Sequence, residues 1–351
     1  MEISLSKDDM QKLISLNKIR KDNLFALSVF KKYLDEYNTL ADKDSISEIC
    51  RDCGTEEADA AAHIICAAFE IEDRDFAKKY IFGAIRKLSA EDYINDAYLR
   101  NIRFPTQKSG NWEFKTESYD AYRLVTCDDL KVFSDLTEIP QLGFFDKPFS
   151  FPAVLENGNE WMTLTPVDTD TAKEAIKNAH GKVITFGLGL GYFAYHAALK
   201  DETSSVCIVE KSKEVINLFS EYILPQFEPK RRKKIKIINA DAFEYAKNEM
   251  ARENYDTAFF DTWRDPSDGY GMYLRAKKIE KDIPHTEWYY WIEEYLISIL
   301  RKKAYDEIWL GANAPEIASE IKNGYKISSF SDILSYLSKE KLKERAATEE
   351  Y

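Results

Sequence analysis

Hydrophobic residues recur at three- and four-residue steps over the first hundred residues, most clearly in the segment 24–34. This spacing places them on one face of a helix and leaves Lys and Glu on the solvated face. No proline precedes Pro105, so nothing in the segment interrupts a helical backbone. The pattern predicts a helical N-terminal domain over residues 1–101.

From residue 102 the sequence pattern changes, because prolines, glycines and short apolar runs replace the helical periodicity. Strands are expected at Tyr122–Val125, Phe151–Leu155 and Trp161–Leu164. Asn157-Gly158 lies between the last two and is typical of a hairpin turn. The pattern predicts a short β-rich connecting segment over residues 102–167.

A regular alternation of strands and helices begins at residue 168 and continues towards the C-terminus. It predicts an α/β fold with a Rossmann-like, mostly parallel sheet and helices on both faces, in a domain of residues 168–351. A helix over Glu287–Leu300 with Thr286 as its N-cap is also expected, and residues 329–345 are typical of helices. The strands are expected at Val183–Phe186, Val206–Val209, Ile235–Ile238, Thr257–Phe260 and Glu307–Leu310.

Charge and composition narrow the class of protein. The 351 residues carry a formal net charge of -12, which argues against a protein whose affinity rests on neutralising phosphates, so no nucleic-acid partner is expected. The N-terminal segment has neither the basic start nor the apolar core of a secretion signal, and no apolar run reaches the roughly 20 residues needed to cross a bilayer. With an odd number of cysteines, five, the sequence favours a cytoplasmic protein in a reducing compartment, without a membrane partner.

Four of the chain's potential metal ligands are clustered in the sequence. Cys50 and Cys53 form Cys-x-x-Cys, and His63 and Cys66 follow, which are ligand types that zinc accepts. Residues 56–70 are expected to form an Ala-rich helix with Thr55 as its N-cap, and on that helix Cys66 falls on the apolar face. Core packing is the simpler interpretation, so we predict no metal site.

A glycine-rich turn carries the strongest functional signal. The apolar strand 182–186 runs directly into Gly187-Leu188-Gly189-Leu190-Gly191, and a helix follows at Tyr192–Leu199. Such a turn lets the backbone approach a ligand and points free amide groups at it. The dinucleotide fingerprint would place a third glycine at position 192, so Tyr192 favours a ligand without a pyrophosphate over NAD.

Acidic residues follow the next two strands at the same edge. Glu210 is expected to accept hydrogen bonds from the hydroxyls of an adenosine ribose. The alternative is a surface glutamate that pairs with Lys211 or Lys213. Asp241 can accept from an adenine amino group beside Ala242 and Phe243, and it can cap the following helix at the same time.

The fourth strand ends in Asp261, which is the first candidate for a catalytic residue, with Asp265 as the second. Trp263, Arg264 and Tyr270 are candidates for binding the substrate, although Arg264 is equally well explained by an ion pair with Asp265. His285 is not favoured as a base, since it lies in the loop before the expected Thr286 cap.

Residues 160–311 resemble the class I S-adenosylmethionine (SAM)-dependent methyltransferase superfamily, including its spermidine synthase-like branch. The resemblance implies that Gly187, Gly189 and Gly191 cradle the methionine part, Glu210 binds the ribose, Asp241 and Ala242 bind adenine, and Asp261 faces the amino group or the acceptor. The segment 160–166 is similar to a pre-core segment that closes over the cofactor. Thr165, Tyr192 and Lys211 are included as further cofactor contacts.

The chain departs from the family pattern in two places. No antiparallel strand pair is recognisable after residue 310, so the middle segment is a candidate source of edge strands. Nor does an Asn-Pro-Pro-Tyr-like tetrad follow the fourth strand, which argues against methylation of a base or amide nitrogen.

The resemblance implies a SAM-dependent methyltransferase acting on a small-molecule acceptor. An aminopropyl transferase that uses decarboxylated SAM is the first alternative. A non-catalytic SAM-binding or interaction protein, with the helical N-terminus as its partner surface, is the second, and an NAD-dependent enzyme ranks below both. The sequence leaves a homo-oligomer open.

Overall fold

Five parallel strands form the central sheet of the computed structural model, which describes residues 1–314 and 325–349. Their order is β11-β10-β9-β12-β13, and every neighbouring pair is parallel. Strands β9, β10, β11 and β12 coincide with predicted strands, so the α/β prediction is confirmed for this part of the chain. The strands are β9 (Gly181–Phe186), β10 (Thr203–Glu210), β11 (Ile235–Asn239), β12 (Thr257–Phe260) and β13 (Glu287–Tyr290).

Both faces of this sheet are buried, because alternate side chains of each strand enter different cores. In β12, Phe259 packs with one cluster while Ala258 and Phe260 pack with the other. Helices therefore cover both faces, as a parallel sheet requires. One face holds α7 (Pro166–Asn178), α8 (Tyr192–Leu199) and α9 (Lys213–Leu218), and the other holds α11 (Ala242–Tyr245), α13 (Pro266–Lys281) and α14 (Glu293–Asn313).

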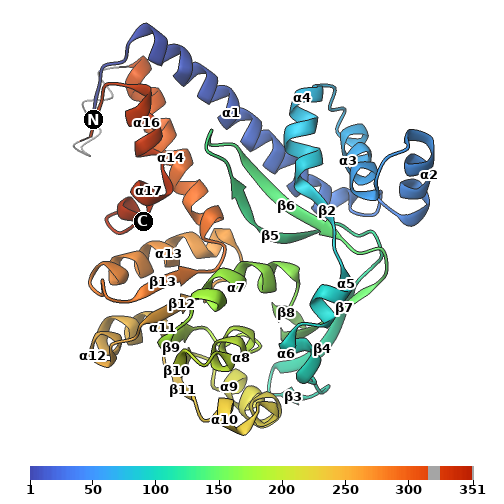
Figure 1. The fold of residues 1–351 in the computed structure, drawn as a ribbon, viewed down its shortest axis with the longest axis vertical. Helices are drawn as coiled ribbons and strands as arrows, with labels where there is room; N and C mark the ends of the chain where they lie inside the picture. Colours follow the sequence, from blue (N-terminus) through green and yellow to red (C-terminus); the bar gives the residue numbers. More distant parts are fainter. Residues whose placement is uncertain (315–324, 350–351) are drawn as a thin grey trace.

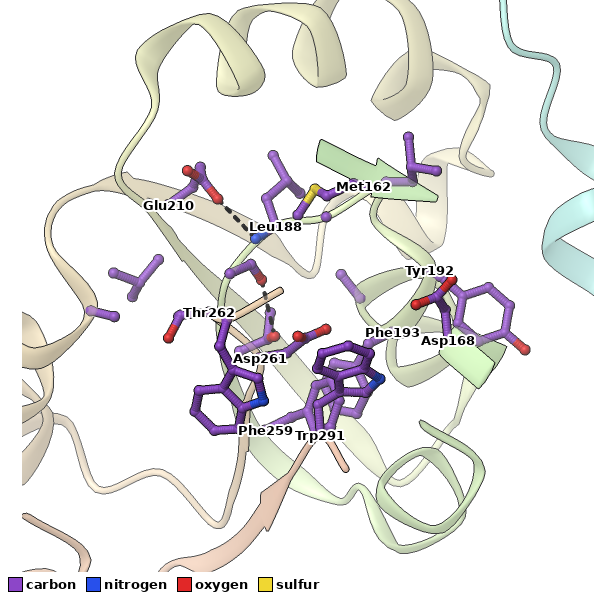
Figure 2. Close-up of a pocket in the computed structure, with 18 of the residues that line it drawn as sticks. Met162, Asp168, Leu188, Tyr192, Phe193, Glu210, Phe259, Asp261, Thr262 and Trp291 are labelled. Carbon is purple, nitrogen blue, oxygen red and sulfur yellow. Dashed lines mark hydrogen bonds between the residues drawn. The ribbon is translucent and has the colours of Figure 1, made fainter. Parts of the chain in front are cut away.

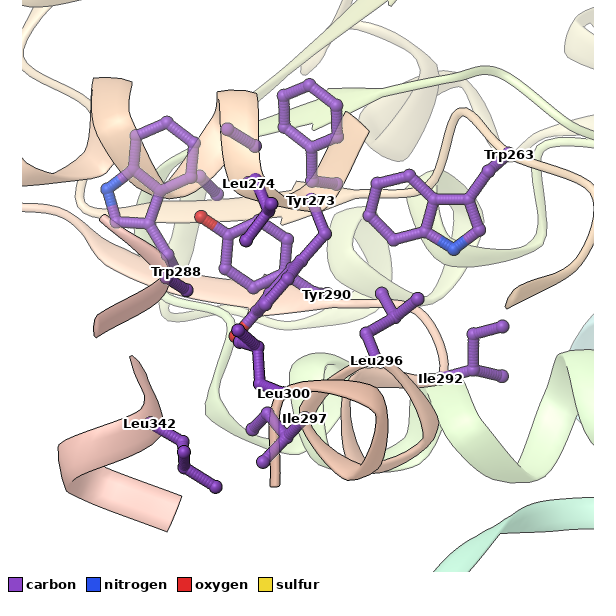
Figure 3. Packing of buried hydrophobic residues seen from close by; sticks show 14 of the residues in the cluster. Trp263, Tyr273, Leu274, Trp288, Tyr290, Ile292, Leu296, Ile297, Leu300 and Leu342 are labelled. Atoms are coloured by element: carbon purple, nitrogen blue, oxygen red, sulfur yellow. The ribbon is translucent and has the colours of Figure 1, made fainter. Parts of the chain in front are cut away.

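Figure 3 shows the core on the face of Ala258 and Phe260, in which aromatic rings from β13 and α13 pack against the leucines and isoleucines of α14. The Phe186 ring stacks on Phe260 with centroids 4.7 Å apart, and Trp288 lies parallel to Phe186 at 6.3 Å. The dense aromatic run after Glu287 is thus part of the sheet and its core.

Two predicted elements in this region are wrong. Residues 287–290 form strand β13 instead of the start of a helix, and the Thr286 hydroxyl donates to the Tyr255 carbonyl at 2.7 Å instead of capping. Ile292, at φ 48°, turns the chain from β13 into α14. The expected strand at 307–310 lies inside α14, where Ile308 continues the helical series of buried residues after Leu300 and Ala304.

The middle segment is β-rich as predicted, but it forms sheets of its own and does not extend the central sheet. The turn Asn157-Gly158, at φ 54° and 81°, joins the last two strands and confirms the hairpin. The strand expected from Tyr122 begins only at Val125, because Tyr122 has a φ of 64°. One sheet contains β3 (Lys108–Ser109), β4 (Trp112–Tyr119), β7 (Phe149–Glu156) and β8 (Asn159–Thr163), and the other contains β2 (Ile85–Lys87), β5 (Val125–Val132) and β6 (Glu138–Phe144).

The N-terminal segment is mostly helical, as predicted. Glu56, and not Thr55, precedes its third helix, while the Thr55 hydroxyl donates to Asp59 at 3.2 Å. In the described chain no three His, Cys, Asp or Glu residues gather as metal ligands, the cysteine region included, and no helix has the length and apolar character to cross a membrane. The helices are α1 (Lys7–Lys32), α2 (Lys43–Cys53), α3 (Glu57–Ala68), α4 (Arg74–Phe76), α5 (Ala90–Ile94) and α6 (Ala97–Asn101).

The two ends of the chain meet. Figure 1 shows the long helix α1 crossing from the C-terminal helices to α2, α3 and α4. Leu13 and Leu16 of α1 belong to the same core as α14, and β1 (Glu2–Ile3) pairs in parallel with β14 (Lys326–Ile327). Helices α16 (Phe330–Tyr336) and α17 (Lys339–Ala346) confirm the helical prediction for 329–345. Two further short helices are α10 (Pro229–Arg232) and α12 (Ala251–Glu253).

Asp129 of β5 supplies the N-terminal cap of α14 from a distant part of the chain. Its carboxylate accepts from the Glu294 and Tyr295 amides at 2.8 and 3.2 Å, whereas Ile292 offers no side-chain cap. We expect Asp129→Ala to lower the free energy of unfolding by about 1–2 kcal/mol, since two helix amides lose their acceptor. Urea denaturation measures the change.

The neighbouring Asp128 provides the control. Its side chain is 37% exposed and lies 3.5 Å from Arg86, so Asp128→Ala should cost no more than about 1 kcal/mol. Equal losses in the two variants would contradict the capping role of Asp129.

Candidate functional site

A cavity of about 430 Å³ opens at the carboxyl ends of the central strands, where open parallel sheets hold their ligands. Figure 2 shows part of its lining, with the Asp261 carboxylate between Glu210 on one side and Asp168 on the other. The cavity brings together most of the residues that the sequence selected. These are Gly187, Gly189, Tyr192, Glu210, Lys211, Asp241, Ala242, Phe243, Asp261, Trp263 and Arg264.

The three glycines of the turn all have positive φ, but their surroundings differ. A Cβ at Gly187 would lie 1.9 Å from the Asp261 carbonyl oxygen, and one at Gly191 would lie 2.3 Å from the Phe219 ring. At Gly189 the nearest atom is the Met162 methyl, at 3.5 Å. Packing therefore requires glycine at positions 187 and 191. Gly187 and Gly189 line the cavity, whereas Gly191 does not, and the turn at Gly189 lies under β8.

Glu210 joins the end of β10 to the glycine turn. One carboxylate oxygen accepts from the Leu188 amide at 3.0 Å, and the other accepts from the Ser212 amide at 2.7 Å. A carboxylate oxygen has two lone pairs, so each retains one for a ligand hydroxyl. The alternative, a surface glutamate paired with Lys211 or Lys213, finds no support among the described residues, because neither lysine forms an ion pair with Glu210 and Lys211 lies 3.6 Å from Asp241.

Asp241 begins α11. One of its oxygens accepts from the Phe243 and Glu244 amides at 3.0 and 3.2 Å, so it caps the helix as predicted. The other oxygen faces Lys211. The Phe243 ring is buried between Phe260 and Arg275, with the Arg275 guanidinium 4.0 Å from the ring centroid, so one face of the ring is already covered.

Two of the four carboxyl groups that line the cavity, those of Asp168 and Asp261, interact electrostatically with each other. Burial, and then the charge of Asp168, raises the pKa of Asp261 to about 8. Among the described residues no group donates to the Asp261 carboxylate, and no cation pairs with it. Burial raises the pKa of Asp168 as well, against hydrogen bonds from Thr165 and Thr163.

Asp168 is a residue that sequence reasoning missed. It is the third residue of α7, where one oxygen accepts from the Thr165 amide at 2.8 Å, the Thr165 hydroxyl at 2.7 Å and the Thr163 hydroxyl at 3.2 Å. The Thr-Pro-x-Asp order at 165–168 was an available signal, since it is typical of a reciprocal helix cap. Thr165 itself is buried outside the cavity and holds Asp168 in place.

Aromatic side chains form one wall of the cavity, and three of them were also missed. Phe193 stacks on Phe259 with centroids 4.5 Å apart, and Trp291 lies beside them (Figure 2). At the mouth, the Arg264 guanidinium lies 5.5 Å from the ring of Trp161 on β8. These contacts join segments of the chain that are distant in the sequence.

Four predicted side chains have surroundings or partners that differ from those expected. Asp265 caps α13 by accepting from the Ser267 amide at 2.7 Å, and Tyr270 packs with the core near Arg345 and Glu349; neither lines the cavity. The Tyr192 hydroxyl points to Asp96, at 3.2 Å, away from the glycine turn. Arg264 lies 3.6 Å from Asp268, so the ion pair that was expected with Asp265 forms with Asp268 instead.

Comparisons with known proteins give no family. No family model matches the chain, and no curated protein matches its sequence. A solved spermidine synthase in complex with the transition state analogue AdoDATO is 12% identical, with a TM-score of 0.30 over 43% of this chain and 56% of that one. The spermidine synthase from Thermotoga maritima is 11% identical, with a TM-score of 0.27 over 51% and 63%.

Both matches span less than two thirds of the spermidine synthase chains. Scores this low carry no argument about activity. The functional conclusion must therefore rest on the cavity itself.

Gly187→Ala tests the close contact under the cavity. The new Cβ would collide with the Asp261 backbone, so we expect a loss of several kcal/mol in the free energy of unfolding, or failure to fold. The control is Gly158→Ala, which has a similar positive φ of 81° but no atom within 4 Å, and should cost only about 1 kcal/mol. Thermal and urea unfolding of both variants separate steric collision from backbone strain.

Asp261 should impose a pH dependence on stability. Its carboxyl ionises at a pKa of about 8 in the folded chain and at an ordinary 3.8 when exposed, so between these values the unfolded chain binds fewer protons. Stability must then fall as the pH rises through this range. Asp261→Asn removes that loss, and its Tm should rise above that of the wild type progressively up to a pH of about 8.

Asp265→Asn is the contrasting control. The Ser267 hydroxyl, as a hydrogen-bond donor, holds the pKa of Asp265 below its usual value, so this ionised carboxylate stabilises the fold at neutral pH and the contribution is lost on acidification. A Tm difference for Asp261→Asn that did not change with pH would refute the assignment.

Proposed function

We propose that this chain is a SAM-dependent methyltransferase that acts on a small-molecule acceptor. The observation that carries the proposal is the convergence of four separate strand ends on one cavity. The glycine turn after β9, Glu210 after β10, Asp241 after β11 and Asp261 after β12 all line it. These are groups suited to a sulfonium nucleoside carrying an amino acid.

The residues present fit the nucleoside. Glu210 has one lone pair free on each oxygen for the ribose hydroxyls, and it is fixed by two backbone amides. Asp241 has an oxygen left beside the exposed Lys211 for an adenine amino group. The backbone at Gly189 would hold the methionine part. The nearest side-chain atom to a Cβ built at Gly189 is the Met162 methyl, at an ordinary van der Waals distance of 3.5 Å.

SAM supplies a methyl group that is activated by its positive sulfur. The chain's contribution is to align the acceptor and to keep water out. Met162 of β8 covers the glycine turn, and Trp161 of β8 packs against Arg264 at the mouth of the cavity. Asp261 can accept a proton from the acceptor, because its pKa of about 8 matches that task near neutral pH.

Titration calorimetry with SAM, S-adenosylhomocysteine and NAD tests the choice of ligand. The two adenosyl compounds should bind and NAD should not, because Tyr192 occupies the place of the third dinucleotide glycine. Glu210→Ala should weaken adenosyl binding at least about tenfold, since two charge-assisted hydrogen bonds are lost. Glu214→Ala, an exposed change on the neighbouring α9, should leave the affinity unchanged.

Preferential binding of NAD would sink the proposal, and an unchanged affinity in Glu210→Ala would remove Glu210 from the site. Decarboxylated SAM in the same series tests the aminopropyl transferase alternative. For the non-catalytic alternative, Asp261→Asn is decisive, because an enzyme should keep SAM binding and lose turnover.

A further inference from the structure

A second cavity, of about 820 Å³, lies between helices α1 and α14 and the sheet of β5 and β6, and we call it the α1–α14 pocket. Figure 1 shows α1 passing over β5 and β6 beside α14. No described residue lines both this pocket and the cavity at the strand ends, although Arg264 lines the one and Asp265 the other. The proposed methyl transfer therefore makes no use of the α1–α14 pocket.

Apolar and aromatic side chains make up most of the wall of the α1–α14 pocket. Leu24 and Leu27 of α1 and Ile299 of α14 line it, and each remains more than one third exposed. A single exposed leucine is ordinary, but these three share one hollow. A pocket of this size and character is typical of sites that hold small molecules with an apolar body.

Tyr305 of α14 places a polar atom without a partner in this apolar wall. The residue is only 3% exposed, and its hydroxyl has no hydrogen-bond partner among the described residues. The ring stacks on Trp309 with centroids 6.3 Å apart, so packing holds the side chain in place. Burial raises the pKa of Tyr305, so the hydroxyl keeps its proton near neutral pH and remains a donor. Buried polar groups are normally hydrogen-bonded, and this donor lacks an acceptor.

Arg20 of α1 adds a second donor at the same end of the pocket. Its guanidinium lies 5.2 Å from the centre of the Tyr305 ring, and one of its terminal nitrogens donates to Asp306. The Arg20 Nε is buried, and no described residue accepts from it. The two donors thus lie together without an acceptor, and one of them is charged. A carboxylate supplies two acceptor oxygens and the opposite charge.

The other charges that line the pocket also favour an anion. Of the three lining carboxylates, Glu138 is held by Arg301 and another caps α13. Lys31 and Lys302 line the pocket, and neither forms an ion pair within the described chain. The acid left to oppose them is Asp35, which is exposed. Two cations without an ion pair against one such acid attract a ligand anion more than a ligand cation.

We propose that the α1–α14 pocket binds an aliphatic carboxylate. Its hydrocarbon chain lies against Leu24, Leu27 and Ile299, and its carboxylate accepts from the Tyr305 hydroxyl and the Arg20 Nε. The site goes beyond the proposed methyl transfer and does not depend on it, since its ligand and its lining residues are different.

Titration calorimetry of the full chain near neutral pH tests the ligand class. Octanoate, 1-octanol and n-octylamine share a carbon chain and differ in the charge of the end group. Octanoate should bind at least about tenfold more tightly than the other two, since only the carboxylate makes charge-assisted hydrogen bonds with both donors. Equal affinities would reduce the site to apolar contact and overturn the proposal, as would the absence of saturable octanoate binding.

Tyr305→Phe removes only the hydroxyl. Octanoate affinity should fall about tenfold, while the Tm of the ligand-free variant should not fall, because the hydroxyl has no partner to lose. The matched control is Tyr290→Phe, whose hydroxyl donates to Glu280 at 2.7 Å outside the pocket. That variant should lose Tm and keep its octanoate affinity. Unchanged octanoate affinity in Tyr305→Phe, or an equal loss of Tm in the two variants, would refute the role of Tyr305.

Leu27→Asp tests the place of the hydrocarbon chain. It puts a negative charge on a partly exposed part of the wall, so the chain should fold and octanoate should bind at least about tenfold more weakly. Ile14→Asp is the control, because Ile14 lies on the same helix, is 47% exposed and does not line the pocket. Octanoate binding that is unchanged in Leu27→Asp, or weakened equally in both variants, would show that the ligand lies elsewhere.

Discussion

The ends of β9 and β12 approach so closely that no side chain fits between them. The Asp261 amide donates to the Phe186 carbonyl at 2.9 Å, and a Cβ at Gly187 would lie 1.9 Å from the Asp261 carbonyl oxygen. The Gly187 amide in turn donates to Val209 at 2.9 Å, at the end of β10. Three strand ends are thus fixed together, and the relative positions of Gly187, Glu210 and Asp261 in the cavity follow from these contacts.

The sheet is also the part of the fold that the sequence predicts best. Strands β9, β10 and β12 are buried on both faces, so each is a short continuous apolar run bounded by polar or glycine residues. The order of strands along the chain then places Gly187, Glu210, Asp241 and Asp261 at one edge, because the carboxyl ends of parallel strands lie together. Four residues distant in sequence could therefore be assigned to one site.

The elements between residues 287 and 313 were harder to predict, because short apolar runs fit both a strand and a helix. The aromatic residues of β13 resemble a helix start after a threonine, and only the left-handed backbone at Ile292 separates strand from helix. The apolar pair Ile308-Trp309 looks like a strand in isolation but continues the helical series of α14. Local patterns did not decide these cases, since packing against the sheet selects between the two periods.

Contacts made across the chain account for what was missed in the site. Asp168, Phe193 and Trp291 come from α7, α8 and the end of β13, and no local motif announces that they face one cavity. Conversely, Asp265 and Tyr270 follow Asp261 closely in sequence, but the helix they belong to turns them away from it. Proximity in the sequence was a poor guide once the chain entered α13.

Two aspartates show why burial alone does not identify a functional carboxylate. Burial raises the pKa of Asp129 to about 7 and that of Asp261 to about 8. The Asp129 oxygens accept from the Glu294 and Tyr295 amides, so its burial is explained by the helix that it caps. Asp261 receives no comparable hydrogen bond from the described chain and faces a second carboxylate. A fold gains no stability from that arrangement, and perturbed groups of this kind are characteristic of sites that bind or react. The missing partner, more than the shifted pKa, is what distinguishes Asp261 as a functional group.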